Sequence, residues 1–453
     1  IRCGNTASLR AKGYVGGIIG AITNGCTVDS CYNTGSITSF SSTGYAVGGI
    51  IGQMQSNATY PSSLSNSWNS GAISGESSSV GGVAGKVTGG QVVADCHNTG
   101  KITVKIADET NTSLNGVGGV FGSCCATATR IWNSGDIESN MPSAAGVIGT
   151  GAMPIAQISH AVNFGNVTVT RTLPDKGYCA GGIWGGYGPA SLSECYNYGA
   201  ITAPDNVGGI NPALHSNGNG GSTVERCFNL GKVTATADTA KFVFGAAGIS
   251  RFYDKRTPID PSLMTVNQTF YADDVCTHVG ADTLGTKLTR AEMMTASLGE
   301  AFTYRKACFP TLAFVDDVPL ANLHAVYMQF ADGDTADNVN NLFNVGIMPH
   351  VSWTVHPILV MEDDGVIRPD QKGEGWVTAT TDEEEPRSKT YAITVMKTVT
   401  GIDDMVTMRE VTEMRYFTLD GLRIEKPQPG VTYILNVLYR DGDSETRKVI
   451  FTR

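Results

Sequence analysis

The 453-residue sequence lacks several features that mark common protein classes. It has no apolar run near the ~18–20 residues that span a membrane as a helix. Charged residues make up only 16% of the chain, and no stretch gathers Lys and Arg into the basic field that nucleic acids and anionic lipids require. The first residues lack the basic, apolar and small-residue parts of a signal peptide. We therefore expect no nucleic-acid partner and no membrane span in this chain.

Motifs of familiar hydrolases are also missing. A zinc peptidase with His-Glu-x-x-His places two imidazoles on one helical face beside a Glu base. None of the seven His residues is followed by Glu, and no two are four positions apart. No Gly-x-Ser-x-Gly elbow lies between a strand and a helix. We assign no catalytic residue, no cofactor and no metal ligand, although a Cys–His dyad stays open because nothing singles one out or removes it.

Charge is distributed unevenly along the chain, which is long enough for two to four domains. Residues 1–250 contain 12 acidic and 12 basic residues, whereas residues 251–453 contain 30 acidic and 20 basic ones. The net charge of −10 therefore comes from the second region. The change in composition suggests a domain boundary near residue 250.

The first region carries two phrases that recur along the chain. One phrase ends in Asn, usually with Gly two positions later, and the intervals between its Asn residues range from 28 to 36. These residues are Asn5, Asn33, Asn69, Asn98, Asn133, Asn163, Asn197 and Asn229. The other phrase contains a glycine pair, at 16–17, 48–49, 81–82, 118–119, 181–182 and 208–209. Self-similarity at this period indicates a solenoid or another repeat array.

The apolar runs between these phrases are short and β-branched, as in Ile18-Ile19 and Lys101-Ile102-Thr103. They are bounded by Gly, Asn and Ser and show no 3.6-residue periodicity, which predicts strands. Strands that repeat without crossover helices indicate a parallel β-helix. We therefore expect a mainly β protein with a parallel β-helix (solenoid) of about eight repeats over residues 1–250. Cys3-Gly4-Asn5 looks like the end of a repeat, so the chain begins within the array. We therefore expect a processed or truncated piece, with any export signal upstream.

Stacking of rungs at ~4.8 Å gives the repeated residues physical roles. We expect each Asn to take a left-handed turn conformation and to bond its amide to the Asn of the next rung. The glycine pairs would allow sharp corners or close approach of neighbouring rungs. The residue before the Asn is often aromatic, and two interpretations stay open: a structural ring stack, or an exposed stripe that stacks on carbohydrate. This position holds Tyr32, Trp68, His97, Trp132, Tyr196 and Phe228.

Cysteine usage also follows the repeat. The chain has 11 Cys residues, an odd number, and five share one repeat position. A repeated position predicts a column of small buried thiols, because disulfide frameworks pair different positions. Those five are Cys3, Cys31, Cys96, Cys195 and Cys227. Cys124–Cys125 and Cys26–Cys31 are the better disulfide candidates.

Beyond residue 250 we expect three further parts. Residues 251–320 would connect and cap the solenoid, with a capping box formed by Thr289 and Glu292. Residues 321–397 read as short alternating strands around Trp353, as in a β-sandwich. Residues 398–453 would form a C-terminal β-domain with a hairpin at Asp420-Gly421. The acidic run 332–335 suggests calcium but lacks the spacing of a calcium loop, so a turn is the alternative.

The two repeated phrases resemble the GLUG motif of bacterial surface proteins and of some proteins called immunoglobulin A1 peptidases. Residues 321–397 look like a bacterial immunoglobulin-like domain, with Trp353 and Gly365 at corresponding places. The last ~50 residues are similar to C-terminal β-domains of exported Bacteroidetes proteins. The resemblance implies an extracellular or outer-membrane-surface protein whose partner is a host glycan or an extracellular protein.

Four functions remain open from the sequence. The first is a non-catalytic surface or adhesion protein, and the second is a carbohydrate-binding module attached to machinery elsewhere. The third is a polysaccharide-processing β-helix enzyme, although no Asp or Glu recurs at a fixed repeat position. The fourth is an accessory fragment of an immunoglobulin A1 protease. Binding is expected in the variable stretches Gln53–Ser63 and Ile106–Leu114 rather than in the repeated phrase itself.

Overall fold

The computed structural model covers residues 1–453 and divides into two compact units, which we describe separately. The first unit comprises residues 1–304 and 312–315, and the second comprises residues 305–311 and 316–453. The structure describes every residue outside 41–43, 58, 108–115, 152–154, 172–178, 187, 218–219, 239, 241, 250–259, 277–282, 305–308, 316–327, 331–336, 339–350, 362–365, 370, 372, 382–387, 396–403, 419–421, 425–427, 429–430, 440–443 and 451–453.

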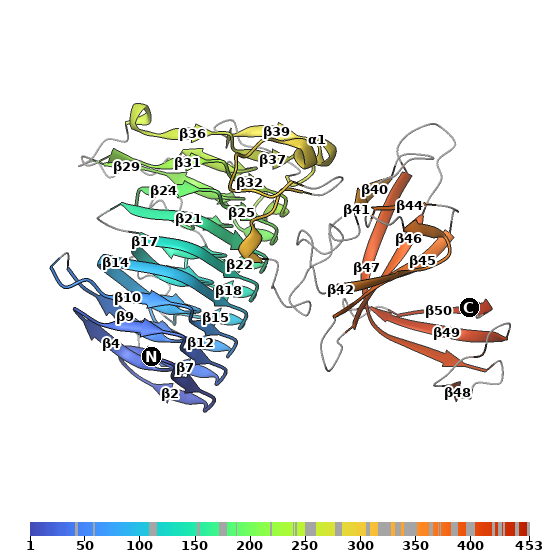
Figure 1. Ribbon diagram of the computed structural model, residues 1–453, viewed down its shortest axis with the longest axis horizontal. Helices are drawn as coiled ribbons and strands as arrows, with labels where there is room; N and C mark the ends of the chain where they lie inside the picture. Colours follow the sequence, from blue (N-terminus) through green and yellow to red (C-terminus); the bar gives the residue numbers. More distant parts are fainter. Residues whose placement is uncertain are drawn as a thin grey trace. The chain divides into compact units, whose positions relative to one another are not determined.

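The first unit is a stack of coils, or rungs, whose strands pair in parallel with those of the next rung (Figure 1). Two of its sheets contain eight strands each, one per repeat. The first, sheet B, consists of β2 (Leu9–Ala11), β7 (Ile37–Ser39), β12 (Ile73–Gly75), β15 (Ile102–Val104), β18 (Ile137–Ser139), β22 (Val167–Val169), β26 (Ile201–Ala203) and β33 (Val233–Ala235). The second, sheet C, consists of β3 (Val15–Gly16), β8 (Ala46–Gly48), β13 (Ser79–Gly81), β16 (Val117–Gly118), β19 (Ala144–Ala145), β23 (Ala180–Gly181), β27 (Val207–Gly208) and β34 (Val243–Phe244).

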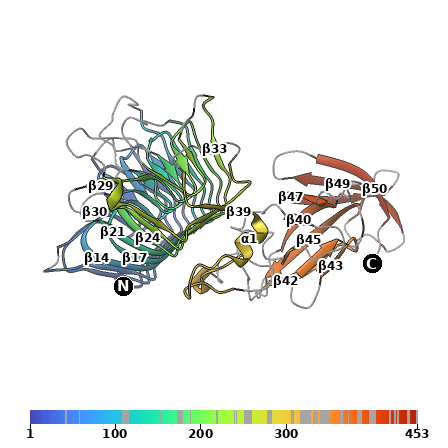
Figure 2. The same cartoon turned by 90° about the horizontal axis from the view of Figure 1, so that it is seen from above.

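The third and largest sheet, sheet A, has 18 strands because each rung crosses it in several segments. Its strands are β1 (Gly4–Asn5), β4 (Ile19–Thr23), β5 (Thr27–Asp29), β6 (Tyr32–Asn33), β9 (Ile51–Gln55), β10 (Ser63–Ser65), β11 (Trp68–Asn69), β14 (Ala84–Asn98), β17 (Phe121–Asn133), β20 (Ile148–Thr150), β21 (Ala156–Asn163), β24 (Ala190–Ser193), β25 (Tyr196–Asn197), β31 (Thr223–Glu225), β32 (Phe228–Asn229), β36 (Thr265–Asn267), β37 (Phe270–Ala272) and β39 (Thr286–Leu288). Seen from above, the coils lie over one another (Figure 2). The parallel β-solenoid expected from the repeats is confirmed.

In-register stacking places like residues on one another inside the coil. In sheet B, Ile37 pairs with Ile73 and Ile73 with Ile102, and all three are buried. The glycine pairs lie where the backbone of one rung approaches both the next rung and the repeated Asn. A Cβ at Gly82 would lie 2.0 Å from the carbonyl oxygen of Gly119 and 2.3 Å from Cγ of Asn98. The two phrases therefore pack against each other, and only glycine fits between them.

Residues after the last repeat cover the end of the solenoid. Strands β36 and β37 pair with β31 and β32 as a further rung, and β39 pairs with β37. The helix α1 (Arg290–Thr295) follows with the expected capping box, since the Thr289 backbone N–H donates to Glu292 Oε2 at 2.7 Å. A three-stranded sheet of β28 (Asn211–Leu214), β35 (Ala247–Ile249) and β38 (Thr283–Leu284) also lies at this end.

The second unit is antiparallel. Its main sheet joins β42 (Val351–Val355), β45 (Gly373–Thr381), β46 (Ser388–Val395), β47 (Asp404–Phe417), β49 (Thr432–Tyr439) and β50 (Ser444–Ile450), and β40 (Met328–Phe330) and β48 (Arg423–Ile424) also pair with β47. A second sheet contains β41 (Asp337–Asn338), β43 (Leu359–Met361) and β44 (Val366–Pro369). Because β47 pairs with both β46 and β49, strands from 321–397 and 398–453 share one sheet. The immunoglobulin-like sandwich stays a prediction.

Strands β47 and β48 pair antiparallel at Phe417 and Arg423, as a hairpin requires, while Asp420-Gly421 lies outside the described residues. Among the described helices, none is long and apolar enough to cross a membrane.

Candidate functional site

The repeated Asn residues form a continuous ladder inside the solenoid. Each amide nitrogen donates to the carboxamide oxygen of the Asn one rung further on, from Asn5 to Asn229, at 2.6–3.0 Å. The last amide donates to the carbonyl oxygen of Gly245 at 2.8 Å. All members from Asn33 onward are fully buried, and each also donates to the carbonyl oxygen two residues later. The expected ladder is confirmed as a structural element, because buried amides need all of these partners.

The expected backbone conformation of these Asn residues is wrong. They lie in strands, and the left-handed residue is the one three positions earlier, with φ between +42° and +55° in nine successive rungs, the last of which has Tyr271 in place of the Asn. This corner column consists of Arg2, Ser30, Asn66, Asp95, Arg130, His160, Glu194, Arg226 and Gln268. The strand conformation aims the Asn amide inward at its partners, so the sharp turn must occur elsewhere in the rung. Because none of these residues is glycine, each left-handed backbone conformation costs ~1–2 kcal/mol.

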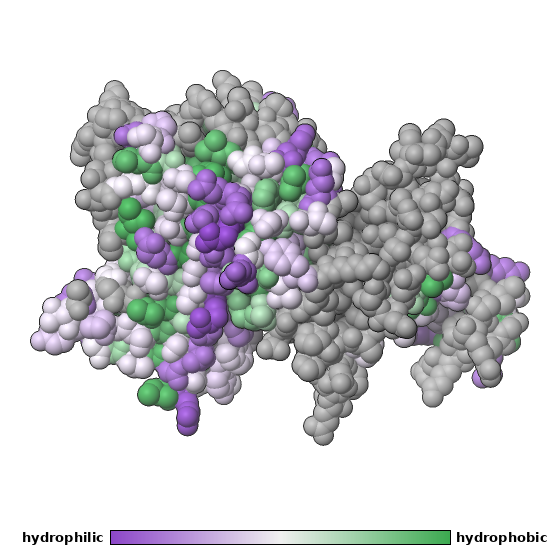
Figure 3. Space-filling view, turned by 45° about the horizontal axis from the view of Figure 1, so that its top comes forward, coloured by the Kyte–Doolittle hydropathy of each residue, from purple (hydrophilic) through white to green (hydrophobic). Residues whose placement is uncertain are grey.

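Polar contacts join neighbouring members of the corner column. Nε and Nη2 of Arg130 donate to the two carboxylate oxygens of Asp95, each at 2.6 Å. Nε of Arg226 donates to Glu194 Oε1 at 2.6 Å. Figure 3 shows a hydrophilic band that crosses the surface of the first unit. The carboxylates of Asp95 and Glu194 are therefore each paired with an arginine of the next rung.

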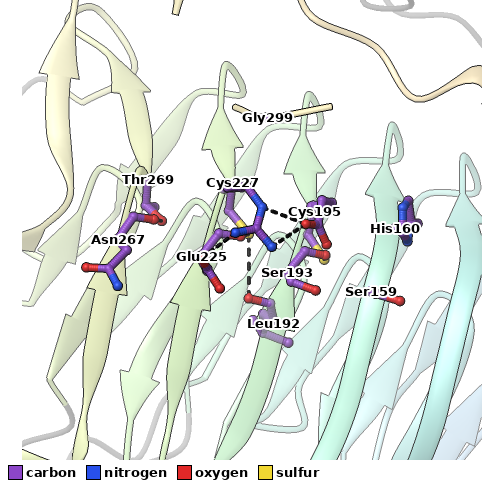
Figure 4. A network of polar contacts seen from close by, with 12 residues as sticks. Ser159, His160, Leu192, Ser193, Cys195, Glu225, Cys227, Asn267, Thr269 and Gly299 are labelled. Carbon is purple, nitrogen blue, oxygen red and sulfur yellow. Dashed lines mark hydrogen bonds and ion pairs between the residues drawn. The ribbon is translucent and has the colours of Figure 1, made fainter. Parts of the chain in front are cut away.

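The pair Arg226–Glu194 lies beneath a segment from outside the repeats. Arg226 also contacts Glu225, and Figure 4 shows Glu225 next to Cys227 in this network, with Gly299 drawn above it. A Cβ at Gly299, which has φ +90°, would lie 3.0 Å from Cδ of Arg226. We call residues Thr289–Tyr304, which cross the solenoid here, the strap.

The aromatic column runs parallel to the Asn ladder and forms a stack. Ring centroids of Tyr32 and Trp68 are 5.2 Å apart, those of Trp68 and His97 6.1 Å, and those of His97 and Trp132 4.2 Å. Interplanar angles are 15°, 6° and 5°. Burial lowers the pKa of His97 to about 4, so its ring is neutral at neutral pH. The structural stack, with His97 as a member, is confirmed.

This geometry decides between the two interpretations of the aromatic column. Because the rings are nearly parallel and stacked along the solenoid, their faces point at one another. Gly4 lies against the remaining face of Tyr32, since a Cβ at Gly4 would be 2.2 Å from Tyr32 Cζ. The surface therefore presents ring edges, and a sugar ring has no open aromatic face on which to stack.

The strap covers the aromatic column in the later rungs. Tyr196 and Phe228 are fully buried, and the ring centroid of Phe302 lies 6.2 Å and 6.0 Å from theirs. Nη2 of Arg290 donates to the carbonyl oxygen of Leu230 at 3.3 Å. In the first rungs the same column is exposed, with 38% of Tyr32 accessible to solvent. The covering expected for residues 251–320 thus includes the side of the solenoid as well as its end.

The position directly after each Asn changes character with this cover. It holds hydroxyl residues in the first rungs and apolar or aromatic residues in the later ones: Thr34, Ser70, Thr99 and Ser134, then Phe164, Tyr198 and Leu230. The first two are exposed and the last three are at most 3% exposed. We call the rungs of Asn33, Asn69 and Asn98 the open rungs, and those of Asn163, Asn197 and Asn229 the covered rungs. The rung of Asn133 is the boundary, where Trp132 is 7% exposed.

The repeated Cys position is structural. Cys31, Cys96, Cys195 and Cys227 are buried, as expected, whereas Cys3 in the first rung is exposed, so the expectation is wrong for that residue. Burial raises the pKa of the Cys96 thiol to about 12. Such a thiol is inert at neutral pH. No disulfide joins the described cysteines, so the two suggested pairs are not bonded. Cys124 and Cys125 lie in the extended strand β17, where consecutive side chains point to opposite faces.

No group of three or more His, Cys, Asp or Glu residues is placed to hold a metal ion in the part of the chain that the structure describes. The acidic run 332–335 lies outside that part, as do 108–114 of the expected binding stretch Ile106–Leu114. Of the other stretch, Gln53–Gln55 belongs to β9 and Ser63 to β10.

The open surface of the first rungs was not anticipated from the sequence, although a signal was present. The change from hydroxyl to apolar or aromatic residues after the repeated Asn is visible without a structure, and the later residues Phe164, Tyr198 and Leu230 are buried. Comparison with known proteins adds no assignment: no family model, no curated protein and no solved structure matches this chain.

Proposed function

We propose that this chain is a non-catalytic binding protein of the cell surface or the extracellular space, and that its solenoid displays the binding surface. The observation that carries the proposal is the difference between the open and the covered rungs. The chain shields its own aromatic column where Phe302 covers Tyr196 and Phe228, yet leaves Tyr32 exposed. A rigid scaffold with one periodic surface left uncovered suits an elongated partner.

The state of the solenoid's acidic residues supports binding over hydrolysis. Glu138, Asp95 and Glu194 pair with Lys101, Arg130 and Arg226, respectively. Hydrolases built on carboxylates need one that donates a proton and one that accepts one, with the pair facing the same bond. Carboxylates held by cations of neighbouring rungs stabilise the solenoid instead.

The resemblance to GLUG-repeat proteins extends this proposal to location and partner. On that basis the protein would be displayed at the outer surface of a bacterial cell or secreted, as in the Bacteroidetes proteins to which its last residues are similar. Its partner would be a host glycan or an extracellular protein. The peptidase activity named for some GLUG-repeat proteins would then belong to a catalytic part other than these residues.

The proposal is tested with the full chain on a glycan array and in pull-downs on immobilised mucin and extracellular-matrix proteins. We expect saturable binding to at least one of these that is unaffected by chelator. Absence of binding in all three, or turnover of any bound polysaccharide or protein, would contradict it. An unrelated β-solenoid of similar charge serves as the control for non-specific retention.

A further inference from the structure

We propose that a patch on the first two rungs binds an acidic segment of a partner protein through two unpaired cations and three exposed aromatic rings. The patch lies at the end of sheet B and in the links that lead from sheet B to sheet C, and we call it the B–C patch. It consists of Arg10, Lys12, Tyr14, Phe40 and Tyr45. The exposed Tyr32 column belongs to sheet A, so the B–C patch is a second, separate surface.

The three rings of the B–C patch are exposed. Tyr14 is 41% exposed, Phe40 42% and Tyr45 44%. The rings of Tyr14 and Tyr45 contact each other edge to face, with centroids 5.4 Å apart and an interplanar angle of 77°. A group of large exposed apolar side chains marks an interaction surface, whereas single ones are normal. Tyr, Phe and Arg are also the side chains that protein–protein interfaces favour.

The corresponding links of later rungs are completed by hydrogen bonds instead. Asn140 Nδ2 donates to the carbonyl oxygen of Ile106 at 2.9 Å, and the Ile106 N–H donates to Asn140 Oδ1 at 2.8 Å. Two rungs further on, Asp205 Oδ1 accepts a hydrogen bond from the N–H of Phe242 at 2.9 Å. The coil can therefore pass from sheet B to sheet C without exposed rings, so the rings of the first two rungs are not a requirement of the fold.

Two cations of the B–C patch lie over the ring of Phe40. Cζ of Arg10 is 5.4 Å and Nζ of Lys12 is 5.2 Å from the ring centroid. Neither side chain forms an ion pair with a described residue, and positions 41–43 of the same link hold Ser, Ser and Thr in the sequence. Because the cation–π contacts hold both charges at the surface, a carboxylate that reaches them gains charge-assisted hydrogen bonds.

The acid nearest to these cations limits where an anion can bind. Glu76 is exposed and occupies the position of Phe40 in the next rung, because Ser39 pairs with Gly75. It lies on the side of Phe40 away from the first rung, to which both cations belong. An acidic ligand is therefore expected on the Arg10 and Lys12 side, where the local charge is positive.

The spacing of the two cations suits an extended peptide. Arg10 and Lys12 are two positions apart in the sequence, at the end of β2. In an extended peptide, side chains two positions apart point the same way and are about 6.4–6.8 Å apart. A Glu-x-Glu segment can therefore offer one carboxylate to each cation. Sugar stacking is less favoured, because the cations lie over Phe40 and the two Tyr rings share no common face.

The experiment uses the full chain and the peptide Gly-Glu-Phe-Glu-Thr-Glu-Gly, which carries a neutral dye, and follows fluorescence anisotropy. We expect saturable binding that weakens as salt is added, and at least tenfold weaker binding when Gln replaces each Glu of the peptide. The double substitution Arg10→Gln with Lys12→Gln should also weaken binding at least tenfold. Phe40→Leu removes the ring that holds the cations and should weaken binding about threefold.

A matched control removes two cations from other rungs. Lys105→Gln with Lys232→Gln changes the net charge equally, and Lys105 occupies the position of Lys12 three rungs further on. This double variant should bind the acidic peptide as the unaltered chain does. Both double variants should keep the melting temperature of the unaltered chain, since all four side chains are exposed. Equal weakening by the two would show that net charge alone attracts the peptide and would overturn the site.

The remaining outcomes are separate from those of the proposed function. Absence of peptide binding at low salt would overturn the B–C patch as a binding site. Binding of heparin or polygalacturonate that depends on Arg10 and Lys12, without binding of the peptide, would overturn the partner class. The proposed function would stand in both cases, because its surface is the Tyr32 column. Conversely, failure to bind glycan, mucin and matrix protein would contradict that function while peptide binding at the B–C patch remained.

Discussion

The open and covered rungs share one interior and differ in what lies outside it. Both contain the Asn ladder, with amide-to-amide distances of 2.7 Å between Asn33 and Asn69 and between Asn197 and Asn229. Outside the ladder, the residue after Asn is Ser or Thr in the open rungs and apolar or aromatic in the covered ones. The repeated phrase therefore specifies the coil, whereas the residue that follows the Asn depends on whether another segment packs against the rung.

The largest expected difference between the two halves concerns their aromatic rings. Phe228→Ala empties a fully buried site against Tyr196 and Phe302 and should lower the free energy of unfolding by about 3–5 kcal/mol. Tyr32→Ala removes a ring that is 38% exposed and should cost about 1 kcal/mol or less. Urea denaturation of both variants measures the difference. Equal losses would show that the strap does not seal the covered rungs.

The solenoid could be predicted from sequence because its repeated residues satisfy one another. An Asn at a fixed position of each rung bonds to the next Asn, and glycine recurs where a Cβ would strike the neighbouring backbone. Each of these constraints acts within a rung or between adjacent rungs, so it leaves a periodic trace in the sequence. The aromatic stack and the buried thiols were predictable for the same reason.

The corner and the strap were not predictable in the same way. The left-handed residue varies from Asp95 to Arg130 to His160, so its conformation has no residue signature. The left-handed residue was predicted at the Asn because Asn is common in left-handed turns, and that position is wrong. The strap contacts Arg226, Phe228 and Tyr196 from more than 70 residues away, and such a non-local contact leaves no periodic trace.

Substitutions in the Asn ladder should cost similar stability in the open and the covered rungs. Asn69→Ala, Asn133→Ala and Asn197→Ala each leave neighbouring buried amides without a partner and should each lower the free energy of unfolding by about 1–3 kcal/mol. Thermal and urea unfolding measure the losses, with binding by the open rungs unchanged for Asn197→Ala. An unaltered melting temperature for any of the three would count against the ladder.

Breaking a corner ion pair should also cost more stability beneath the strap than away from it, by a smaller margin than the aromatic rings do. Arg226→Gln leaves Glu194, which is 8% exposed, without its cation beneath the strap and should cost about 1–2 kcal/mol. Arg130→Gln breaks a pair whose side chains are 45% and 36% exposed, so its cost should be below about 1 kcal/mol. Adding salt should reduce the Arg130 effect further. A larger loss for Arg130→Gln would reverse this ranking.

The smallest expected effect is a pH dependence that belongs to the open rungs. Burial lowers the pKa of His97 from 6.5 to about 4, so between these values the unfolded chain binds a proton that the folded chain does not. The contribution of His97 to stability is therefore complete above about pH 7 and is lost as the pH falls toward 4. His97→Phe keeps a ring in the stack and removes the titration, so its melting temperature should fall less between about pH 7 and pH 4.5 than that of the unaltered chain. Trp68→Phe, which changes a neighbouring ring that does not titrate, should retain the full pH dependence. If His97→Phe lost as much melting temperature on acidification as the unaltered chain, other groups would cause the loss. The stack would then not shield His97 from water, as its lowered pKa requires.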